Sequence, residues 1–300
     1  MLPQRVLVLG VATGLGRRLA VRLGRHADFD VLGADREAPP EPLVGVSLAV
    51  LGGKTRTSAH RSAVHRLLLD FSPHTVVFLS PWHDAQRCEA APVACAAQFA
   101  DAVRATARGC LGLGIRLVVH SSDLVFGGAS AAAPAGSAGG GLFAETDRPA
   151  PATLAGRQHL AAENAARGAG FHRWAVVRTG PLYATGDADD PLARAASGEA
   201  TPFERAHAAL ARPYTHADEA AAGLERLLRH GAHGLYHVAG HEALPPAAFA
   251  TLARSAAGLP PLAGGTAAAT RATALLTLRA ETELGWRTTH RLGEQVKGRR

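Results

Sequence analysis

The residues with the clearest chemical potential form a glycine-rich loop near the start of the chain. The loop follows the apolar run Val6–Leu9, and its candidate cofactor-binding residues are Gly10, Thr13, Gly14, Leu15 and Gly16. Glycines at this spacing allow a sharp turn, close approach of a pyrophosphate and tight helix–strand packing. The following helix would present free N–H groups and a positive dipole to the phosphates. The loop therefore predicts a dinucleotide site, the alternative being a glycine-rich turn without a ligand.

A carboxylate stands where a dinucleotide ribose would need one. Asp35 follows the second apolar strand and lies about 20 residues beyond the loop, where a carboxylate accepts hydrogen bonds from the ribose hydroxyls of NAD. Arg36 is its neighbour, and Arg17 and Arg18 lie in the preceding helix. Because arginines can accommodate the additional phosphate of NADP, we expect NAD as the cofactor with NADP as the alternative.

Short apolar segments alternate with helical patterns over the first 180 residues. The predicted strands are Val6–Leu9, Asp30–Gly33, Thr75–Leu79, Ile115–His120 and Trp174–Arg178. The predicted helices are Leu15–Arg25, Ser58–Leu69, Ala85–Cys110 and Ala155–Arg167. Continuous apolar strands separated by helices indicate a parallel sheet covered on both faces. We therefore predict an α/β fold with a doubly wound, Rossmann-type parallel sheet.

The alternation loosens after Gly180, which predicts two domains. Residues 1–180 would form the dinucleotide-binding domain, and residues 181–300 a smaller, mostly helical substrate lobe at the carboxyl edge of the sheet. The expected elements of the lobe are helices at Pro202–Leu210, Ala217–His230 and Pro245–Ala257 and a strand at Leu235–Val238. Residues 127–141 are almost wholly Gly, Ala, Ser and Pro, which predicts a flexible surface loop, either a lid or a neutral insertion.

Composition narrows the partners and the compartment. The net charge is +7, but the arginines are scattered and only 5% of residues are aromatic, so we expect no nucleic-acid partner. Cys88, Cys95 and Cys110 are odd in number and lack a C-x-x-C pair, so we expect no disulfide framework and a reducing, cytoplasmic location. The histidines are dispersed and no apolar run reaches the length of a membrane span, so we expect neither a metal site nor a membrane segment.

Several segments resemble the short-chain dehydrogenases/reductases, and most resemble their extended branch of nucleotide-sugar epimerases, dehydratases and reductases. Leu117–Gly127, which contains Ser-Ser-Asp, is similar to a stretch of the dTDP-4-dehydrorhamnose reductases. Residues 212–217, Arg-Pro-Tyr-Thr-His-Ala, resemble the "R-D-Y-x-H-V" of sugar-nucleotide epimerases. Phe71–Val77 and Arg178–Tyr183 resemble further strand segments of this family. The glycine loop differs, because its G-x-x-x-G-x-G spacing follows the compact branch.

The resemblance implies a role for each matching residue. Ser122 falls on the catalytic Ser/Thr that hydrogen-bonds the substrate, and Ser80 and Pro81 fall where the chain lines the cofactor. Arg212 falls on a residue that grips a substrate diphosphate, which suits a planar guanidinium. The plainer alternatives are that Ser122 caps the end of a strand, that Ser80 and Pro81 form only a turn, and that Arg212 is a surface arginine. Further candidates for substrate contact are Trp82, His83, Asp123 and Tyr183.

The family's catalytic dyad, Y-x-x-x-K, has no counterpart in this chain. The three tyrosines are Tyr183, Tyr214 and Tyr236, and none is followed by lysine four residues later. The family's pattern around this dyad matches the chain at Pro151, Gly156 and Glu163. In this match the tyrosine position is Ala155 and the lysine position is His159. Ala155 has no proton to exchange, and the loss of a positioned proton donor typically costs about 10²–10⁴ in rate. His159 is a catalytic and cofactor-binding candidate, the alternative being a partly exposed helix histidine.

Three functions are compatible with these residues. The first is an atypical NAD(P)-dependent reductase, epimerase or dehydratase acting on a nucleotide-sugar-like or other hydroxy/keto metabolite. The second is a catalytically inactive protein that binds a dinucleotide or sugar nucleotide and regulates a partner. The third is a cofactor-free isomerase or lyase. The resemblance further implies a homodimer formed through helices of the dinucleotide-binding domain.

Overall fold

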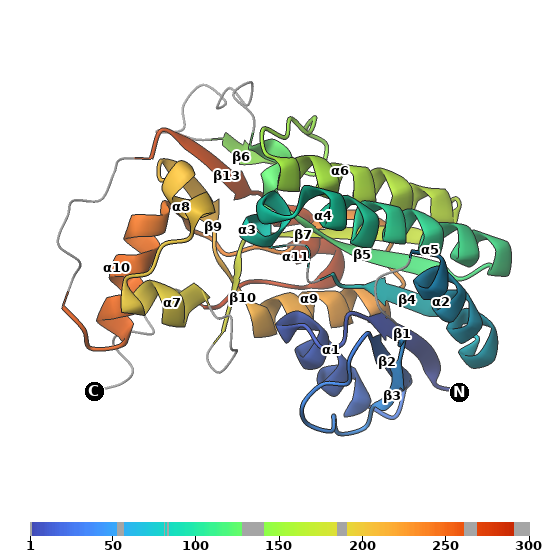
Figure 1. Cartoon of the computed structure of the whole chain (residues 1–300). Helices are drawn as coiled ribbons and strands as arrows, with labels where there is room; N and C mark the ends of the chain where they lie inside the picture. Colours follow the sequence, from blue (N-terminus) through green and yellow to red (C-terminus); the bar gives the residue numbers. More distant parts are fainter. Residues whose placement is uncertain are drawn as a thin grey trace.

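The computed structural model describes residues 2–52, 57–80, 82, 84–127, 141–184, 191–260 and 269–290. At its centre is a seven-stranded sheet in the order β11-β7-β5-β4-β1-β2-β3, with every neighbouring pair parallel (Figure 1). The strands are β1 (Gln4–Leu9), β2 (Phe29–Asp35), β3 (Ser47–Val50), β4 (Thr75–Phe78), β5 (Arg116–Ser122), β7 (Trp174–Thr179) and β11 (Gly234–His237). The predicted strands all belong to this sheet, and β3 is an additional edge strand.

Helices cover both faces of the sheet, as expected for a doubly wound fold. One face carries α1 (Gly14–Gly24), α9 (Ala217–Arg229) and α11 (Leu278–Leu284), and the other carries α2 (Thr57–Phe71), α5 (Ala100–Leu113) and α6 (Leu154–Ala166) (Figure 1). Side chains alternate along each strand, so Val6 and Val8 join the buried cluster of the first face while Leu7 and Leu9 join that of the second. Burial on both faces explains why these strands read as continuous apolar runs.

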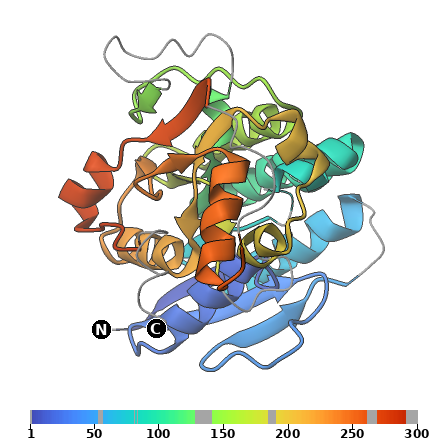
Figure 2. The same ribbon diagram turned by 90° about the vertical axis from the view of Figure 1, so that its left-hand side faces the viewer.

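A smaller lobe packs at the carboxyl edge of the sheet and lies at the front of Figure 2. It contains α7 (Pro191–Ser197), α8 (Pro202–Ala206) and α10 (Pro246–Ala256), and the strand pair β8 (Leu182–Tyr183) and β10 (Thr215–His216). A four-stranded sheet has the order β12-β9-β13-β6, formed by Ala243–Leu244, Leu210–Pro213, Arg271–Leu275 and Gly141–Phe143. The lobe is therefore mixed, whereas the sequence pattern predicted a mostly helical one.

The predicted boundary at residue 180 does not separate the sheet from the lobe. α9 and β11 come after this point, yet α9 packs beside α1 and β11 pairs with β7 in the main sheet. The sequence pattern missed this return because pairing over a long sequence separation leaves no local signal. Residues 128–140, most of the predicted flexible loop, lie outside the described residues.

The long helix predicted at Ala85–Cys110 is divided into α3 (Ala85–Ala90), α4 (Pro92–Gln98) and the first part of α5. Pro92 lacks an N–H and its ring clashes with the preceding turn, so a helix cannot run through it. Ala91 and Phe99 take non-helical backbone angles at the two breaks.

The structure of α3 and α4 contradicts the expectation of no disulfide. Cys88 on α3 and Cys95 on α4 form one, and Cys110 on α5 is free and buried. The break at Ala91–Pro92 folds α4 back on α3 and brings the two sulfurs together, a proximity that a continuous helix would not give.

Two further findings concern ions and membranes. Within the described ranges, no three or more His, Cys, Asp or Glu side chains cluster as a metal ion would require. No helix among those same ranges is both long and apolar enough to span a bilayer.

Candidate functional site

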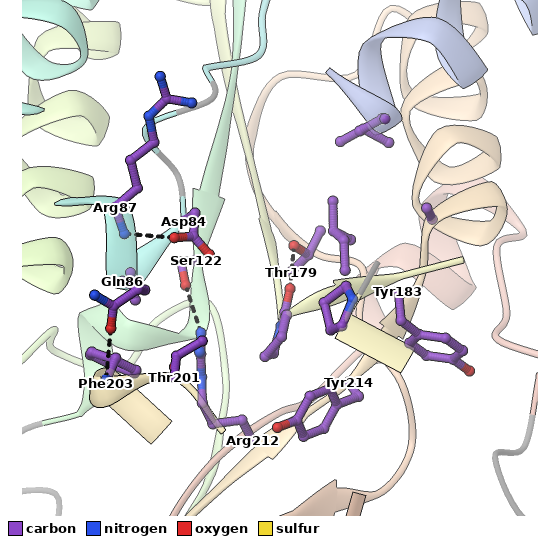
Figure 3. Close-up of a pocket in the computed structure, with 18 of the residues that line it drawn as sticks. Asp84, Gln86, Arg87, Ser122, Thr179, Tyr183, Thr201, Phe203, Arg212 and Tyr214 are labelled. Carbon is purple, nitrogen blue, oxygen red and sulfur yellow. Dashed lines mark hydrogen bonds between the residues drawn. The ribbon is translucent and has the colours of Figure 1, made fainter. Parts of the chain in front are cut away.

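A cavity of about 710 Å³ lies between the carboxyl edge of the sheet and the lobe. Its sheet side comes from residues that follow β1, β2, β5 and β7, and its other side from α3, α7, α8 and the start of α9. Figure 3 shows Asp84, Gln86 and Arg87 of α3 on one wall and Tyr183 and Tyr214 on the other. Ligands of doubly wound folds bind at this edge, which makes the cavity the candidate site.

The glycine loop forms one end of the cavity. Gly10 has φ +90°, and a Cβ atom on it would lie 1.5 Å from the carbonyl oxygen of Leu79. A Cβ on Gly16 would lie 2.1 Å from the carbonyl oxygen of Gly10. Both positions therefore need glycine, one for its backbone angle and both for close packing.

The other loop residues open directly onto the cavity. Thr13, Gly14 and Leu15 line it, and Thr13 caps α1 by accepting a hydrogen bond from the N–H of Gly16 at 3.0 Å. The Thr13 hydroxyl donates in turn to the carbonyl oxygen of Gly10 at 2.7 Å. The loop is thus rigid, and the positive end of the eleven-residue helix α1 faces the cavity.

Asp35 lies at the end of β2 and also lines the cavity. Its carboxylate accepts hydrogen bonds from the backbone N–H groups of Ala12 at 3.0 Å and of Arg36 at 2.7 Å. These contacts fix its orientation beside the loop. Arg36 is not among the described lining residues, whereas Arg17 of α1 is.

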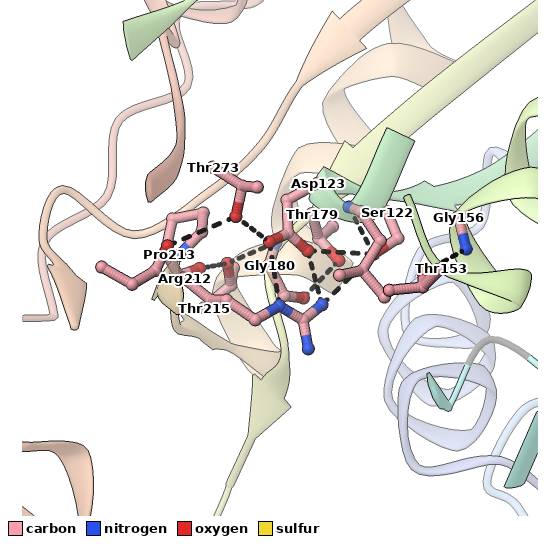
Figure 4. Close-up of polar contacts among 12 residues, drawn as sticks. Ser122, Asp123, Thr153, Gly156, Thr179, Gly180, Arg212, Pro213, Thr215 and Thr273 are labelled. Atoms are coloured by element: carbon pink, nitrogen blue, oxygen red, sulfur yellow. Dashed lines mark hydrogen bonds and ion pairs between the residues drawn. The ribbon is translucent and has the colours of Figure 1, made fainter. Parts of the chain in front are cut away.

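At the sheet's centre, Ser122, Asp123 and Arg212 form one polar cluster (Figure 4). The Ser122 hydroxyl donates to Asp123 Oδ1 at 2.9 Å and accepts from the N–H of Leu124 at 3.2 Å and from Arg212 Nη2 at 3.4 Å. A hydroxyl has one proton to donate and two lone pairs. The hydrogen-bonding capacity of Ser122 is therefore used within the protein, although Ser122 does line the cavity.

Arg212 reaches this cluster from β9 and binds Asp123 through two nitrogens. Its Nε donates to Oδ2 at 2.9 Å and its Nη2 to Oδ1 at 2.6 Å. Asp123 is fully buried and also accepts a hydrogen bond from the Thr273 hydroxyl. Burial acts to lower the pKa of Arg212, but the charge and hydrogen bonds of Asp123 outweigh it and raise that pKa. Arg212 therefore keeps its charge, and Asp123 lies outside the described lining of the cavity.

The two positions of the missing dyad lie outside the described cavity lining. Ala155 and His159 are both fully buried on α6. The His159 ring packs edge-on against Phe99, with 4.9 Å between centroids. The N–H of Ala155 donates to Glu89 Oε1 of α3 at 3.1 Å. The structure thus does not bring His159 to the site, because α3 and the Phe99 ring cover this face of α6.

The remaining predicted residues divide between the core and the cavity wall. Ser80 is buried and its hydroxyl accepts from the N–H of Trp82 at 3.1 Å. Trp82 belongs to the hydrophobic core and donates its indole N–H to Gln98 at 3.2 Å, so it does not serve as a cavity residue. Tyr183 lines the cavity, and its contact with a substrate stays a prediction. Pro81 and His83 lie outside the described residues.

The sequence pattern missed much of the wall opposite the glycine loop. The lining residues not foreseen include Asp84, Gln86, Arg87, Arg194, Thr201, Phe203, Glu204 and His207. They come from the short helices α3, α7 and α8, which no motif marks. Tyr214, which the sequence placed only within the motif at residues 212–217, also lines this wall. Its ring stacks on Phe249 at 3.7 Å, and Figure 3 shows its hydroxyl directed toward Arg212.

A buried charged network supports the sheet edge beneath Ser122. Glu163 of α6 accepts hydrogen bonds from Ser121 at 2.7 Å and from two nitrogens of Arg178, each at 2.7 Å. Arg178 also contacts His237 of β11 at 3.3 Å. Burial, followed by the charge of Arg178, lowers the pKa of His237 to about 3. His237 is therefore neutral at physiological pH, and the network is a rigid support.

Comparison with known proteins gives one family. A family model described as the RmlD substrate binding domain matches residues 4–277. A dTDP-4-dehydrorhamnose reductase of Sinorhizobium fredii is 29% identical over 166 residues, which cover 55% of this chain and 51% of the relative. The chain thus spans about half the length of this curated relative.

Solved structures share the fold across the whole chain. A UDP-glucuronic acid 4-epimerase from Bacillus cereus, in complex with a UDP-sugar and NAD, has a TM-score of 0.75 and 15% identity, covering 98% of this chain and 97% of that one. A dTDP-4-dehydrorhamnose reductase from Bacillus anthracis in complex with NADP has a TM-score of 0.70 and 19% identity, covering 99% and 97%. A dTDP-glucose 4,6-dehydratase from Streptomyces venezuelae with NAD bound has a TM-score of 0.73 and 18% identity, covering 98% and 96%.

Proposed function

The chain belongs to the RmlD substrate-binding-domain family, and from this premise we propose that it binds a nicotinamide dinucleotide together with a nucleotide-sugar-like ligand, without the family's tyrosine-driven proton transfer. The observation that carries the proposal is the contrast within one cavity. The glycine loop and Asp35 are open to a ligand, whereas Ser122 is satisfied internally and Ala155 and His159 lie outside the lining.

The dinucleotide part rests on the fit of the loop. Gly10 and Gly16 let the loop pack tightly against neighbouring backbone, and Thr13, Gly14 and the N-terminus of α1 face the cavity. The loop would hold the pyrophosphate through backbone N–H groups, and Asp35 would accept hydrogen bonds from the adenosine ribose. A bound dinucleotide would supply hydride chemistry. Asp35 favours NAD, and Arg17 on the cavity wall keeps NADP as the alternative.

The nucleotide-sugar part rests on the opposite end of the cavity. Arg212 uses Nε and Nη2 on Asp123, and Figure 4 shows its Nη1 directed away from that carboxylate. Arg194, Thr201 and Tyr214 add hydrogen-bond donors to the same wall. Guanidinium and hydroxyl donors suit a diphosphate, and the related structures above carry UDP- or dTDP-sugar names.

The loss of catalysis rests on the geometry of the proton donors. A substrate carbonyl could receive a hydrogen bond from Ser122 only if the bond to Asp123 were broken. Ala155 offers no proton, and the ring of His159 is enclosed by Phe99 and α6. A redox cycle that needs a proton at the substrate oxygen would therefore be slowed by about 10²–10⁴ relative to a complete dyad.

Titration calorimetry with NAD, NADH, NADP and NADPH tests this function. We expect micromolar binding of at least one of them and no turnover when 4-keto nucleotide sugars are added. Gly10→Val should abolish this binding. Gly112→Ala on α5 is its matched control, because a Cβ there meets nothing within 4 Å and should leave binding unchanged. Failure of all four cofactors to bind would reject the proposal and favour a cofactor-free isomerase or lyase.

An atypical enzyme is the second candidate, and Tyr214 is the observation that favours it. Its phenol lines the cavity, is directed toward Arg212 and has its ring fixed by Phe249. Burial raises the pKa of Tyr214, so the phenol stays protonated and can donate a hydrogen bond to a substrate oxygen. Turnover of a keto sugar by the wild type that is lost in Tyr214→Phe would establish this candidate instead. A cytoplasmic location and a homodimer remain predictions.

A further inference from the structure

Two cysteines form a covalent tie in the cavity wall. The Cys88–Cys95 disulfide joins α3 to α4 across the break at Ala91 and Pro92. Both cysteines are fully buried. Burial raises the pKa of the third cysteine, Cys110, to about 12, so its thiol is poorly reactive. The disulfide is therefore the part of this cysteine set that a change in redox conditions would act on.

α3 carries one wall of the cavity. Asp84, Ala85, Gln86, Arg87 and Ala90 line the cavity, whereas Cys88 points into the hydrophobic core. Ala85 belongs to both the lining and the core, whereas Gln86 and Ala90 lie on the side of α3 away from Cys88. A shift of this six-residue helix would displace every one of those lining residues.

The same helix connects the lobe to α6. Gln86 Oε1 accepts a hydrogen bond from the N–H of Phe203, at the start of α8, at 2.8 Å. Glu89 Oε1 accepts from the N–H of Ala155 at 3.1 Å. Both contacts depend on where α3 lies, so a change in its position would disturb its contacts with α8 and with α6.

The position of α3 depends on tertiary ties. A helix of six residues is too short to be stable alone. α4, by contrast, leads into Phe99, which is 1% exposed and packs on His159. The disulfide adds a covalent link between α3 and this part of the chain to the hydrogen bonds that α3 makes itself.

We propose that the Cys88–Cys95 disulfide is a redox-controlled tie that holds the α3 wall in its ligand-binding position, so that reduction weakens binding in the cavity. This inference rests on the proposed function, because it concerns the affinity of the same cavity. The redox state of the disulfide would regulate the affinity of the cavity for its ligand, whether or not the chain catalyses a reaction.

The switching chemistry is thiol–disulfide exchange with a dithiol reductant. One thiolate of the reductant attacks a sulfur of the disulfide and forms a mixed disulfide, and its second thiol resolves that bond. Cys88 and Cys95 end as thiols with two electrons and two protons from the reductant, which becomes a cyclic disulfide. Because both sulfurs are buried, exchange proceeds through local opening of the short helices α3 and α4.

The expected size of the effect follows from population arithmetic. Apparent Kd equals the intrinsic Kd divided by the fraction of molecules in the binding position. If α3 keeps that position in about a third to a tenth of reduced molecules, Kd rises about three- to tenfold.

The test compares NADH or NADPH binding, whichever the wild type prefers, in air-oxidised and dithiothreitol-reduced full-length protein. Cys88→Ser/Cys95→Ser mimics the reduced state, and Cys110→Ala is the matched control that retains the disulfide. We expect a three- to tenfold higher Kd for reduced wild type and for the double variant, no effect of dithiothreitol on the double variant, and an oxidised wild-type Kd for oxidised Cys110→Ala. Equal Kd values for all forms would overturn the inference, as would three free thiols in the unfolded, air-oxidised protein.

A second readout does not depend on ligand. Hydrogen exchange of the amides at 84–98 and at the start of α6 should accelerate on reduction, while the amides of β1 and α1 stay unchanged. If no cofactor binds the oxidised protein, the proposed function fails, and accelerated exchange still supports the tie. Unchanged exchange on reduction overturns the tie whether or not a cofactor binds.

Discussion

The two ends of the cavity differ in what their polar groups are bound to. At the glycine-loop end, Thr13, Gly14 and Asp35 make contacts that shape the site and leave it open. At the serine end, Ser122, Asp123 and Arg212 mainly satisfy one another. The comparison teaches that two ends of one cavity can differ in how many of their polar groups remain available to a ligand. It motivates our proposal that the first end binds a ligand while the second end does not supply a proton.

The largest expected effect is at the loop. Gly10→Val should abolish cofactor binding and lower the stability by several kcal/mol, because φ is +90° and a Cβ would lie 1.5 Å from the carbonyl oxygen of Leu79. Calorimetric titration and thermal unfolding measure the two effects. Gly112→Ala, in open space on α5, should behave as wild type or be slightly more stable. Cofactor binding by Gly10→Val at wild-type affinity would contradict the proposal that the glycine loop holds the cofactor.

The next effect is at the serine end. Asp123→Asn should cost about 3–5 kcal/mol of unfolding free energy, because it leaves the Arg212 charge without its buried partner. Asp101→Asn is the control, because its pair with Arg104 is exposed and should contribute less than about 1 kcal/mol. Denaturant unfolding compares the two. A cost for Asp123→Asn no larger than that of the control would show that the cluster is not a structural unit.

The buried network of Glu163, Arg178 and His237 predicts that the free energy of unfolding decreases at acid pH. His237 has a folded pKa of about 3 against an ordinary value of 6.5, so between these values the unfolded chain binds a proton that the folded protein does not. Stability contributed by neutral His237 is therefore present above pH 6.5 and lost as pH falls, approaching about 1.4 kcal/mol for each pH unit between 6.5 and 3. Unfolding free energies of wild type and His237→Gln across pH 7 to 4 test this. Parallel pH profiles for the two proteins would contradict it.

The smallest effect sharpens the cofactor choice. Asp35→Ala should weaken NAD binding roughly ten- to a hundredfold, since a charged hydrogen bond contributes about 1.5–3 kcal/mol, and should affect NADP less. Competition titrations of the variant with both dinucleotides give the ratio. Arg36→Ala is the neighbouring control, because Arg36 is outside the described lining and should leave the ratio unchanged. An unchanged NAD affinity in Asp35→Ala would remove Asp35 from the site.

The sequence could single out the glycine-loop end because the structure it requires is local, and its role in binding a cofactor stays a prediction. Gly10 and Gly16 are required by a turn of a few residues, and Asp35 lies at the end of the neighbouring strand. The predicted parallel sheet followed from apolar strands whose periodicity survives without tertiary information.

The other end depended on contacts that no pattern encodes. Ser122 and Arg212 are ninety residues apart, and their joint dependence on Asp123 leaves no motif. The Cys88–Cys95 disulfide depends on the break at Pro92, and the burial of His159 depends on Phe99 from another helix. The family frame located the missing dyad in the sequence, but only the packing revealed that its place is covered.

The most direct test of the central claim is a single-turnover measurement. The chain is loaded with NADH or NADPH, loading is confirmed by nicotinamide fluorescence, and the absorbance of the reduced nicotinamide is followed after rapid mixing with a panel of 4-keto nucleotide sugars. The account predicts a loaded protein whose reduced nicotinamide is oxidised no faster than in cofactor alone. Rapid first-order oxidation of the bound cofactor would contradict it and would show that proton transfer survives without the tyrosine.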